Sequence, residues 1–236
     1  HWNNDPIAKQ QLKRASIVGM SYNDSHSYGD RAFTKHDRRV LDMKHLSGKD
    51  RRELAHFAIR TINSARNAMN LPSWTYSSNA ERFAMNTAKY YTQDGAGNDD
   101  DDHDVHAILK AAKQNGLRTD LGQVYEDESG FEELPNARYQ TMWHAKLMLR
   151  LNIEQMLFGN WTPRKLQSDI YYHDLKDPKR YIEWDHTKDL LDAHNHYDNP
   201  NKEIGVAFSV RGNDEVSVHI LTVPQEYIVH PSKYYR

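Results

Sequence analysis

Cysteine is absent from the 236-residue chain. Its absence excludes a disulfide framework and any metal site built on thiolates. Long apolar runs are also missing, because no stretch approaches the roughly 18 residues that a membrane-spanning helix requires. Neither sign of charge dominates: 31 basic and 33 acidic residues leave a formal net charge of −2, with no basic block. We therefore expect no transmembrane segment in this fragment and no nucleic-acid partner.

The common catalytic signatures are missing as well. The sequence contains no G-x-S-x-G, P-loop, H-E-x-x-H or dinucleotide-binding pattern. No signal peptide is visible, but the chain begins with His1, so we expect a fragment or a processed form whose missing leader leaves export open. Apolar residues make up 38% and the mean hydropathy is −0.92, which predicts a modest core under a very polar surface.

Helical periodicity begins only after a polar arm, residues 1–40. Apolar residues then recur at spacings of three and four, which predicts helices over 46–72, 77–95, 104–116 and about 137–158. Ser47 and Asp50 resemble a capping box, Ser78 or Asn79 can cap the second helix, and Gly95 suits its end. These helices belong to a domain that we place at residues 41–230, followed by a tail, 231–236.

The C-terminal part changes period. "EIGVAFSV" and "EVSVHILTV" are rich in β-branched residues and flank "RGND", which predicts an antiparallel hairpin. The long segment before it is polar and mostly loop, with a short helix near 187–191. Helices first and a hairpin last indicate an α+β fold.

The stretch "NDDDDHDVHAI", residues 98–108, is the first candidate site. His103 and His106 stand three apart at a helix start, so they could share one face and hold a divalent ion beside the aspartates. The alternative, which spacing favours, is an ordinary acidic helix N-terminus in which Asp102 or Asp104 caps.

Two further stretches combine acids with aromatic residues. "GQVYEDESGFEE" is expected to be a solvated loop, although Tyr125 could direct Glu126 toward a core. In "EWDHTKDLL", His186 follows an acid and precedes an apolar run, so it could line a cavity. A lone histidine is more often structural than catalytic, and the spacing alone leaves both alternatives open.

The order of these motifs carries a family resemblance. "INSARNAMNLP", "DHDVHAILKAAKQNGL", "VYED", "EWDHTKDLL", "IGVAFSV" and "VSVHILTVP" occur in this order, over about residues 41–228. Together they resemble the surface-exclusion family of Gram-positive surface proteins, a bacterial branch of the CAP superfamily. The resemblance implies a CAP-like α-β-α sandwich with a small antiparallel sheet covered by helices.

The resemblance also implies a cavity with two histidines and two acids. Matched motif by motif, these are His103, Glu126, Glu154 and His186. His103 and His186 would be the metal ligands, with Zn²⁺ or Ca²⁺ as the divalent ion. His103 and Glu126 stand 23 residues apart, wider than in eukaryotic members, and Glu154 is the weakest match.

Three functions follow as hypotheses. The first is a non-catalytic module, secreted or on the cell surface, that contacts a cell-envelope component or another cell. The second is a metal-dependent hydrolase, in which Glu154 or Asp185 would act as the general base. The third is a carrier of a small ligand or lipid, which would need an apolar groove.

Overall fold

The computed structural model describes residues 36–97, 103–131, 137–158, 185–191, 202–212 and 214–236. They fall into two compact units, each described by itself. The first unit contains residues 150–158 and 185–191. The second contains the described residues from 36 to 149 and from 202 to 236. Residues 1–35 of the predicted arm lie outside the described residues.

A four-stranded sheet forms the centre of the second unit, in the order β2-β5-β6-β3. Its strands are β2 (Thr75–Tyr76), β5 (Glu203–Val210), β6 (Val216–Val223) and β3 (Glu126–Gly130). The predicted hairpin is confirmed as β5 and β6, which pair antiparallel over their full length. The sheet is mixed, because the short β2 runs parallel to β5.

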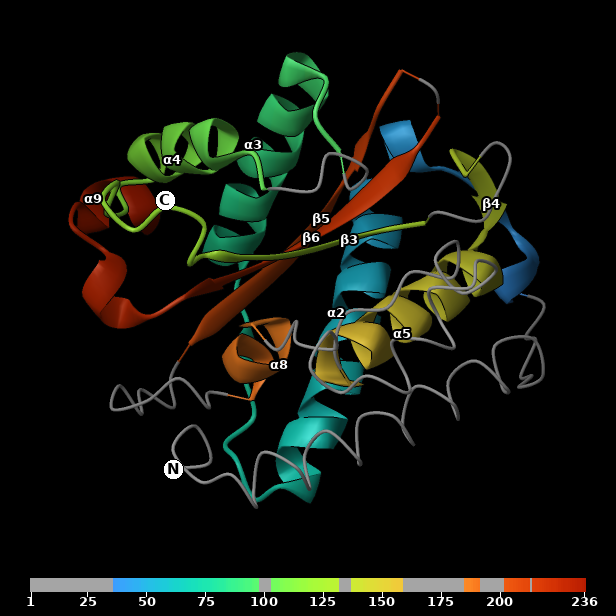
Figure 1. The fold of residues 1–236 in the computed structure, drawn as a ribbon. Coiled ribbons are helices and arrows are strands. Elements are labelled where there is room, and N and C mark those ends of the chain that lie inside the picture. Colours follow the sequence, from blue (N-terminus) through green and yellow to red (C-terminus); the bar gives the residue numbers. More distant parts are fainter. Residues whose placement is uncertain (1–35, 98–102, 132–136, 159–184, 192–201, 213) are drawn as a thin grey trace, which may run out of the picture. The chain divides into compact units, whose positions relative to one another are not determined.

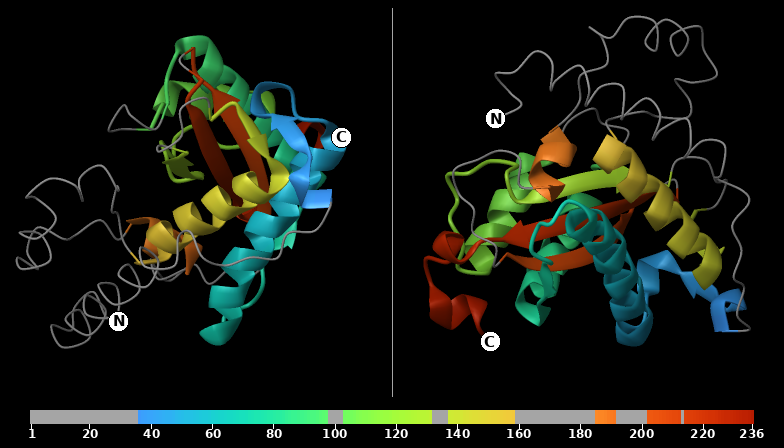
Figure 2. Two further views of the ribbon diagram at one scale, coloured as in Figure 1. Left: turned by 90° about the vertical axis from the view of Figure 1, so that its right-hand side faces the viewer. Right: turned by 90° about the horizontal axis from the view of Figure 1, so that it is seen from below.

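Helices α2 (Gly48–Ala68) and α3 (Ser78–Asp94) lie on the same face of this sheet (Figures 1 and 2). The Ser47 cap of the predicted capping box is confirmed, since the Ser47 side chain accepts from the backbone N–H of Asp50 and donates to the Asp50 carboxylate. Helix α3 is capped one residue earlier than predicted, by Ser77. It ends as predicted at Gly95, which takes the left-handed conformation with φ 70°.

The close approach of α3 to β5 depends on one glycine. A Cβ added to Gly205 would lie 2.2 Å from the carbonyl carbon of Ala80, inside the backbone of α3. Beside this contact, α3 packs on α4 (Val105–Gln114) and on the sheet through a continuous apolar core that includes Phe83, Ile108 and Leu221. The position of α3 over the sheet is therefore fixed by backbone contact as well as by side-chain burial.

The fourth predicted helix begins later than its apolar pattern suggested. Residues 139–141 form β4 (Tyr139–Thr141), which pairs antiparallel with β1 (Val40–Asp42). Helix α5 (Met142–Phe158) then follows and runs into the first unit. Pairing with a strand nearly 100 residues away is a tertiary effect that a local period cannot show.

The six C-terminal residues, predicted as a tail, carry the short helix α9 (Pro231–Tyr234). Tyr234 is fully buried in the same core as Phe83 and Leu221. Its hydroxyl donates to Glu203 on β5 at 2.8 Å. These residues therefore pack on the second unit.

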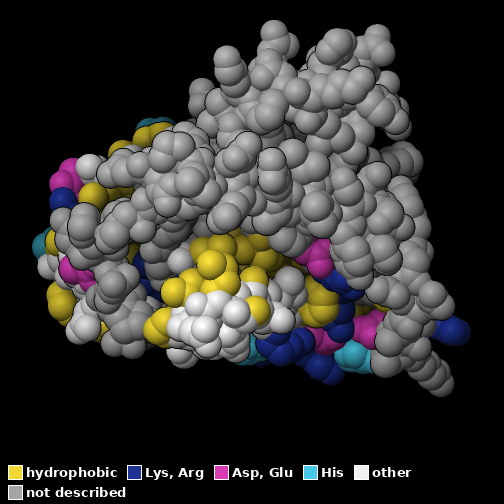
Figure 3. Space-filling model, turned by 60° about the horizontal axis from the view of Figure 1, so that its bottom comes forward, with side chains coloured by type: hydrophobic (Ala, Val, Ile, Leu, Met, Phe, Trp, Pro, Cys, Tyr) yellow, Lys and Arg dark blue, Asp and Glu magenta, His cyan; other side chains and the backbone are white. Residues whose placement is uncertain are grey.

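Charged side chains on the surface are mixed in sign. Figure 3 shows basic, acidic and histidine side chains next to one another along the lower right edge of the face it draws. Arg39, for example, contacts both Asp50 and Glu53. Among the described helices, none combines the length and the apolar character needed to cross a bilayer.

Candidate functional site

Glu126, the first residue of β3, is the centre of a buried polar cluster. Three side chains contact its carboxylate. The Tyr91 hydroxyl donates to Oε2 at 2.6 Å, His103 Nδ1 lies 3.0 Å from the same oxygen, and His219 Nδ1 lies 2.8 Å from Oε1. The donors come from α3, from the residues before α4 and from β6. Three separate parts of the chain thus meet on one carboxylate.

Strand register explains this convergence. Successive side chains of a strand alternate between faces, so Glu126 and Glu128 of β3 point to the same side. Glu128 pairs with His219 of β6, and His219 pairs with Ala207 of β5. Because Ala207 packs in the core beneath α3, this is the face that α3 covers. The acids therefore point toward Tyr91 rather than toward solvent.

His219 has both ring nitrogens engaged. Beside the contact with Glu126, its Nε2 lies 2.8 Å from the Ser209 hydroxyl, and its ring centroid lies 4.5 Å from that of Tyr91. The side chain is completely buried. Burial alone would lower the pKa of His219, but the hydrogen bond to Glu126 raises it above its ordinary value.

Glu126 shows the complementary shift. Burial opposes its ionised form, but the hydrogen bonds from His103 and His219 outweigh burial and hold the pKa of Glu126 below its ordinary value. The low pKa of Glu126 and the raised pKa of His219 favour the same state, in which a carboxylate faces an imidazolium. The contact is thus a buried ion pair in which both carboxylate oxygens and both ring nitrogens have protein partners.

Tyr91 links this pair to α4. Its hydroxyl accepts from the backbone N–H of Asp104 at 2.8 Å while donating to Glu126. Asp104 in turn caps α4, because its side chain accepts from Ala107 N–H at 2.9 Å. Burial, followed by the charge of Glu126, raises the pKa of Tyr91, so the hydroxyl stays protonated as a donor. The favoured prediction of an aspartate-capped helix start is confirmed.

Glu128 behaves differently from Glu126. Burial raises its pKa to about 7, against an ordinary value of 4.5. Its Oε1 is buried and has no hydrogen-bond partner within the described residues. Ligand atoms of His103, Glu126 and Glu128 lie within 4.8 Å of one another, which is close enough for one metal ion. One imidazole and two carboxylates are a donor set that suits Zn²⁺.

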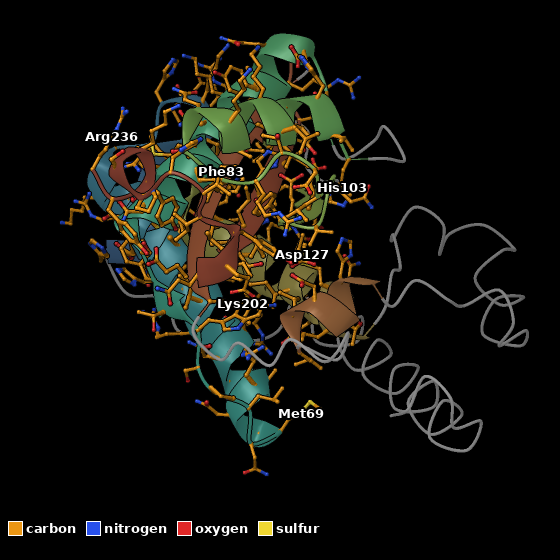
Figure 4. The ribbon with its side chains drawn as sticks, turned by 90° about the vertical axis from the view of Figure 1, so that its left-hand side faces the viewer. Met69, Phe83, His103, Asp127, Lys202 and Arg236 are labelled. Carbon is orange, nitrogen blue, oxygen red and sulfur yellow. The ribbon has the colours of Figure 1, made fainter. Side chains whose placement is uncertain are left out.

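The structure brings together two of the four predicted cavity residues, His103 and Glu126. In Figure 4, His103 lies where the chain enters α4, beside the sheet. Glu154 lies on α5 and pairs with Arg150 at 2.9 Å. His186 lies on α8 (Asp185–Leu190), beside Thr187, whose hydroxyl donates to the backbone of Met156. Both belong to the first unit, and their place in the cavity stays a prediction.

His106 does not join the cluster. It lies 3.2 Å from Asp94 at the surface, whereas His103 points to Glu126. The two histidines diverge because His103 precedes the helix, so the helical spacing that would align them does not apply. A shared metal face on His103 and His106 is therefore wrong.

The prediction of a solvated acidic loop is also wrong. Glu126, Asp127 and Glu128 are all buried in β3. Backbone pairing with β6 satisfies the main chain, while histidine and tyrosine partners stabilise the charge of Glu126. Sequence reasoning also missed His219, Glu128 and Tyr91. The available signal was a histidine inside the apolar strand "VSVHILTV", where burial requires an internal partner.

Comparisons with known proteins agree with this architecture. No family model matches the chain, and no curated protein matches it. Among solved structures, the CAP domain of Enterococcal PrgA is similar with a TM-score of 0.64 and 20% sequence identity. The match covers 93% of this chain and 80% of that chain. The predicted α+β sandwich is confirmed, and the chain has the fold of a CAP domain.

Proposed function

We propose that the chain is a non-catalytic binding module, displayed outside a Gram-positive cell, that mediates contact with a cell-envelope component or another cell. The observation that carries the proposal is the fold match to an enterococcal CAP domain over 93% of the chain. The sequence motifs resemble a family of Gram-positive surface proteins, which favours the same setting. A shared fold does not by itself transmit an activity, so the site must supply the rest.

The acid–histidine cluster supports the non-catalytic part. A general base needs a lone pair within reach of substrate. Both oxygens of Glu126 already accept from protein donors, and both ring nitrogens of His219 already have partners in Glu126 and Ser209. The cluster joins α3, β3, β5, β6 and the start of α4. Its arrangement suits a structural role in a domain that has no disulfide.

Binding to intact cells tests the proposal. The fluorescently labelled chain is incubated with intact enterococci and with cells of a Gram-negative species, and bound label is measured by flow cytometry. We expect saturable binding to the Gram-positive cells that excess unlabelled chain displaces, with a labelled unrelated protein of similar size as the control. A signal that neither saturates nor is displaced would contradict the proposal.

One observation favours a second candidate, a divalent-metal site with hydrolase chemistry. His103, Glu126 and Glu128 present their ligand atoms within 4.8 Å, and Glu128 Oε1 is a buried oxygen with no partner among the described residues. A bound Zn²⁺ would lower the pKa of a coordinated water. Metal titration separates the two candidates.

A further inference from the structure

A second feature of the surface lies away from the cluster, between α4 and the C-terminal segment. Leu117 and Ile228 form an antiparallel bridge, and the backbone N–H groups of Val229 and His230 both donate to the Gly116 carbonyl. These contacts hold residues 228–233 beside the end of α4, and Figure 1 shows α9 next to that helix. Between them lies a groove of about 1040 Å³.

The rim of this groove is basic. Lys110, Lys113, Arg118 and Lys233 line it, together with a single carboxylate, Asp120. Asp120 is already occupied, because it forms a bidentate pair with Arg118. Four cations against one acid leave an excess of positive charge in the lining, whereas the chain as a whole has a formal net charge of −2. The groove is therefore more positive than the chain as a whole.

Two of these cations lack ion-pair partners. Within the described part of the chain, no carboxylate pairs with the ammonium groups of Lys113 and Lys233, both of which are exposed. Lys110 lies over the ring of Tyr90, at 4.0 Å, and not on an acid. Elsewhere on the surface, Arg39 and Lys146 each contact two acids. The groove thus offers positive charge that no internal acid neutralises.

The floor of the groove is apolar. Val105, Leu109 and Val229 line it, and Val229 is 48% exposed. A polyanion such as polyphosphate would neutralise the lysines but would leave these side chains uncovered. A peptide with carboxylates on its edges and apolar side chains on one face would satisfy both. Grooves of this kind bind amphipathic helices through spaced apolar anchors.

We propose that this groove binds an acidic, amphipathic segment of a partner protein. The inference rests on the proposed function, since it assigns the surface through which the binding module contacts its partner. Apolar side chains of the segment would pack on Leu109 and Val229, and its carboxylates would pair with Lys113 and Lys233. Such contacts weaken as salt screens the rim.

Fluorescence polarisation with a labelled model peptide tests the inference. The probe is an amphipathic peptide with leucines on one face and glutamates on the other. We expect the Lys110→Glu/Lys113→Glu/Lys233→Glu variant to bind it at least about 10-fold more weakly than the native chain, a change of 1.4 kcal/mol. The matched control, Lys49→Glu/Arg52→Glu/Arg60→Glu, carries the same charge change at exposed basic residues of α2 that lie outside the groove, and it should bind normally.

Further variants and peptides in the same assay separate the contribution of apolar contacts to binding from that of charge. Val229→Ser should weaken peptide binding by about 3-fold or more, because it removes part of the floor. Val124→Ser is the control, since Val124 is 51% exposed and does not line the groove. A peptide with glutamine for glutamate, or serine for leucine, should bind more weakly than the probe. Equal binding by either peptide, by polyphosphate or by the triple groove variant would overturn the inference.

Binding to cells keeps this test distinct from that of the proposed function. If the native chain binds cells and the groove variant binds equally well, the surface module stands and the groove is not its contact site. If the native chain does not bind cells at all, the proposed function fails whatever the peptide does. Loss of cell binding in the groove variant alone supports both.

Discussion

The buried cluster around Glu126 and the groove beside α4 differ in whether their charged side chains have partners within the protein. In the cluster, the Glu126 carboxylate has three internal partners. At the groove, Lys113 and Lys233 have no ion-pair partner among the described residues. An unpaired charge is costly in a protein interior but not in water. Internal pairing is therefore expected of a structural centre, whereas the unpaired lysines of the groove remain available to the partner proposed above.

The largest predicted effect comes from breaking the buried ion pair. His219→Leu leaves the Glu126 carboxylate buried without its imidazolium, so we expect a loss of about 3–5 kcal/mol in the free energy of unfolding. Urea denaturation measures this loss. Adding Glu126→Gln to the same chain should recover part of it, because the uncompensated charge is then removed.

Ser209→Ala is the control for this experiment, since it removes only a neutral partner of His219. We expect it to cost about 1 kcal/mol. If His219→Leu cost no more than Ser209→Ala, the ion pair would not be the structural centre of the site.

Glu128 provides a pH-dependent prediction. Because its pKa is raised from 4.5 to about 7 in the folded protein, the folded state keeps a proton that the unfolded chain has lost between these pH values. The contribution of Glu128 to stability therefore falls as pH rises through this range. Glu128→Gln does not titrate, so its stability relative to the native chain should rise by about 3 kcal/mol between pH about 4.5 and about 8.

Denaturation series on both chains, with a chelator present, measure this difference across the pH range. The expected curves diverge as pH rises. Parallel curves would show that Glu128 titrates normally and is not held in an environment that opposes its charge.

The Tyr91→Phe variant tests whether the buried cluster stabilises the start of α4. Tyr91→Phe removes a hydroxyl that donates to Glu126 and accepts from the Asp104 N–H. We expect a loss of about 1–2 kcal/mol in the free energy of unfolding. Hydrogen exchange should also show faster opening of the first turn of α4. Tyr90→Phe is the control, because its hydroxyl makes only an exposed contact with Gln114; equal losses in both variants would contradict the link.

The smallest predicted effect on stability belongs to the groove. Replacing Lys110, Lys113 and Lys233 with glutamate should change the free energy of unfolding by less than about 0.5 kcal/mol per site. None of these lysines has an ion pair to lose within the described residues. The same denaturation assay measures it. A loss comparable to that of His219→Leu would show that the groove, too, is structural.

Sequence periodicity was enough to predict the helices and strands whose structure depends on local sequence. Helices α2, α3 and α4 followed from apolar spacing and from caps such as Ser47 and Gly95. The hairpin followed from β-branched residues around a turn. Strand β4 was missed because its formation depends on pairing with β1, which is remote in the chain.

Two of the four candidate site residues predicted from the sequence lie together in the structure. His103 and Glu126 came from motif order, and the structure places them in contact. Strand β3 was not predicted, because "YEDESG" has the composition of a loop and becomes a strand only when His219 and Tyr91 compensate its charge. Partners supplied by tertiary structure are invisible to local composition.

Metal titration tests the central claim, that the cluster around Glu126 is a structural centre in which Glu126 and His219 are held by protein partners. Zn²⁺ and Ca²⁺ are titrated by calorimetry into the native chain and into His103→Ala, Glu128→Gln and His186→Ala. The account predicts no micromolar binding that depends on His103 or Glu128. Stoichiometric binding that both of these variants abolish would contradict it and would establish the metal-site candidate, and additional loss in His186→Ala would place that histidine on the same ion.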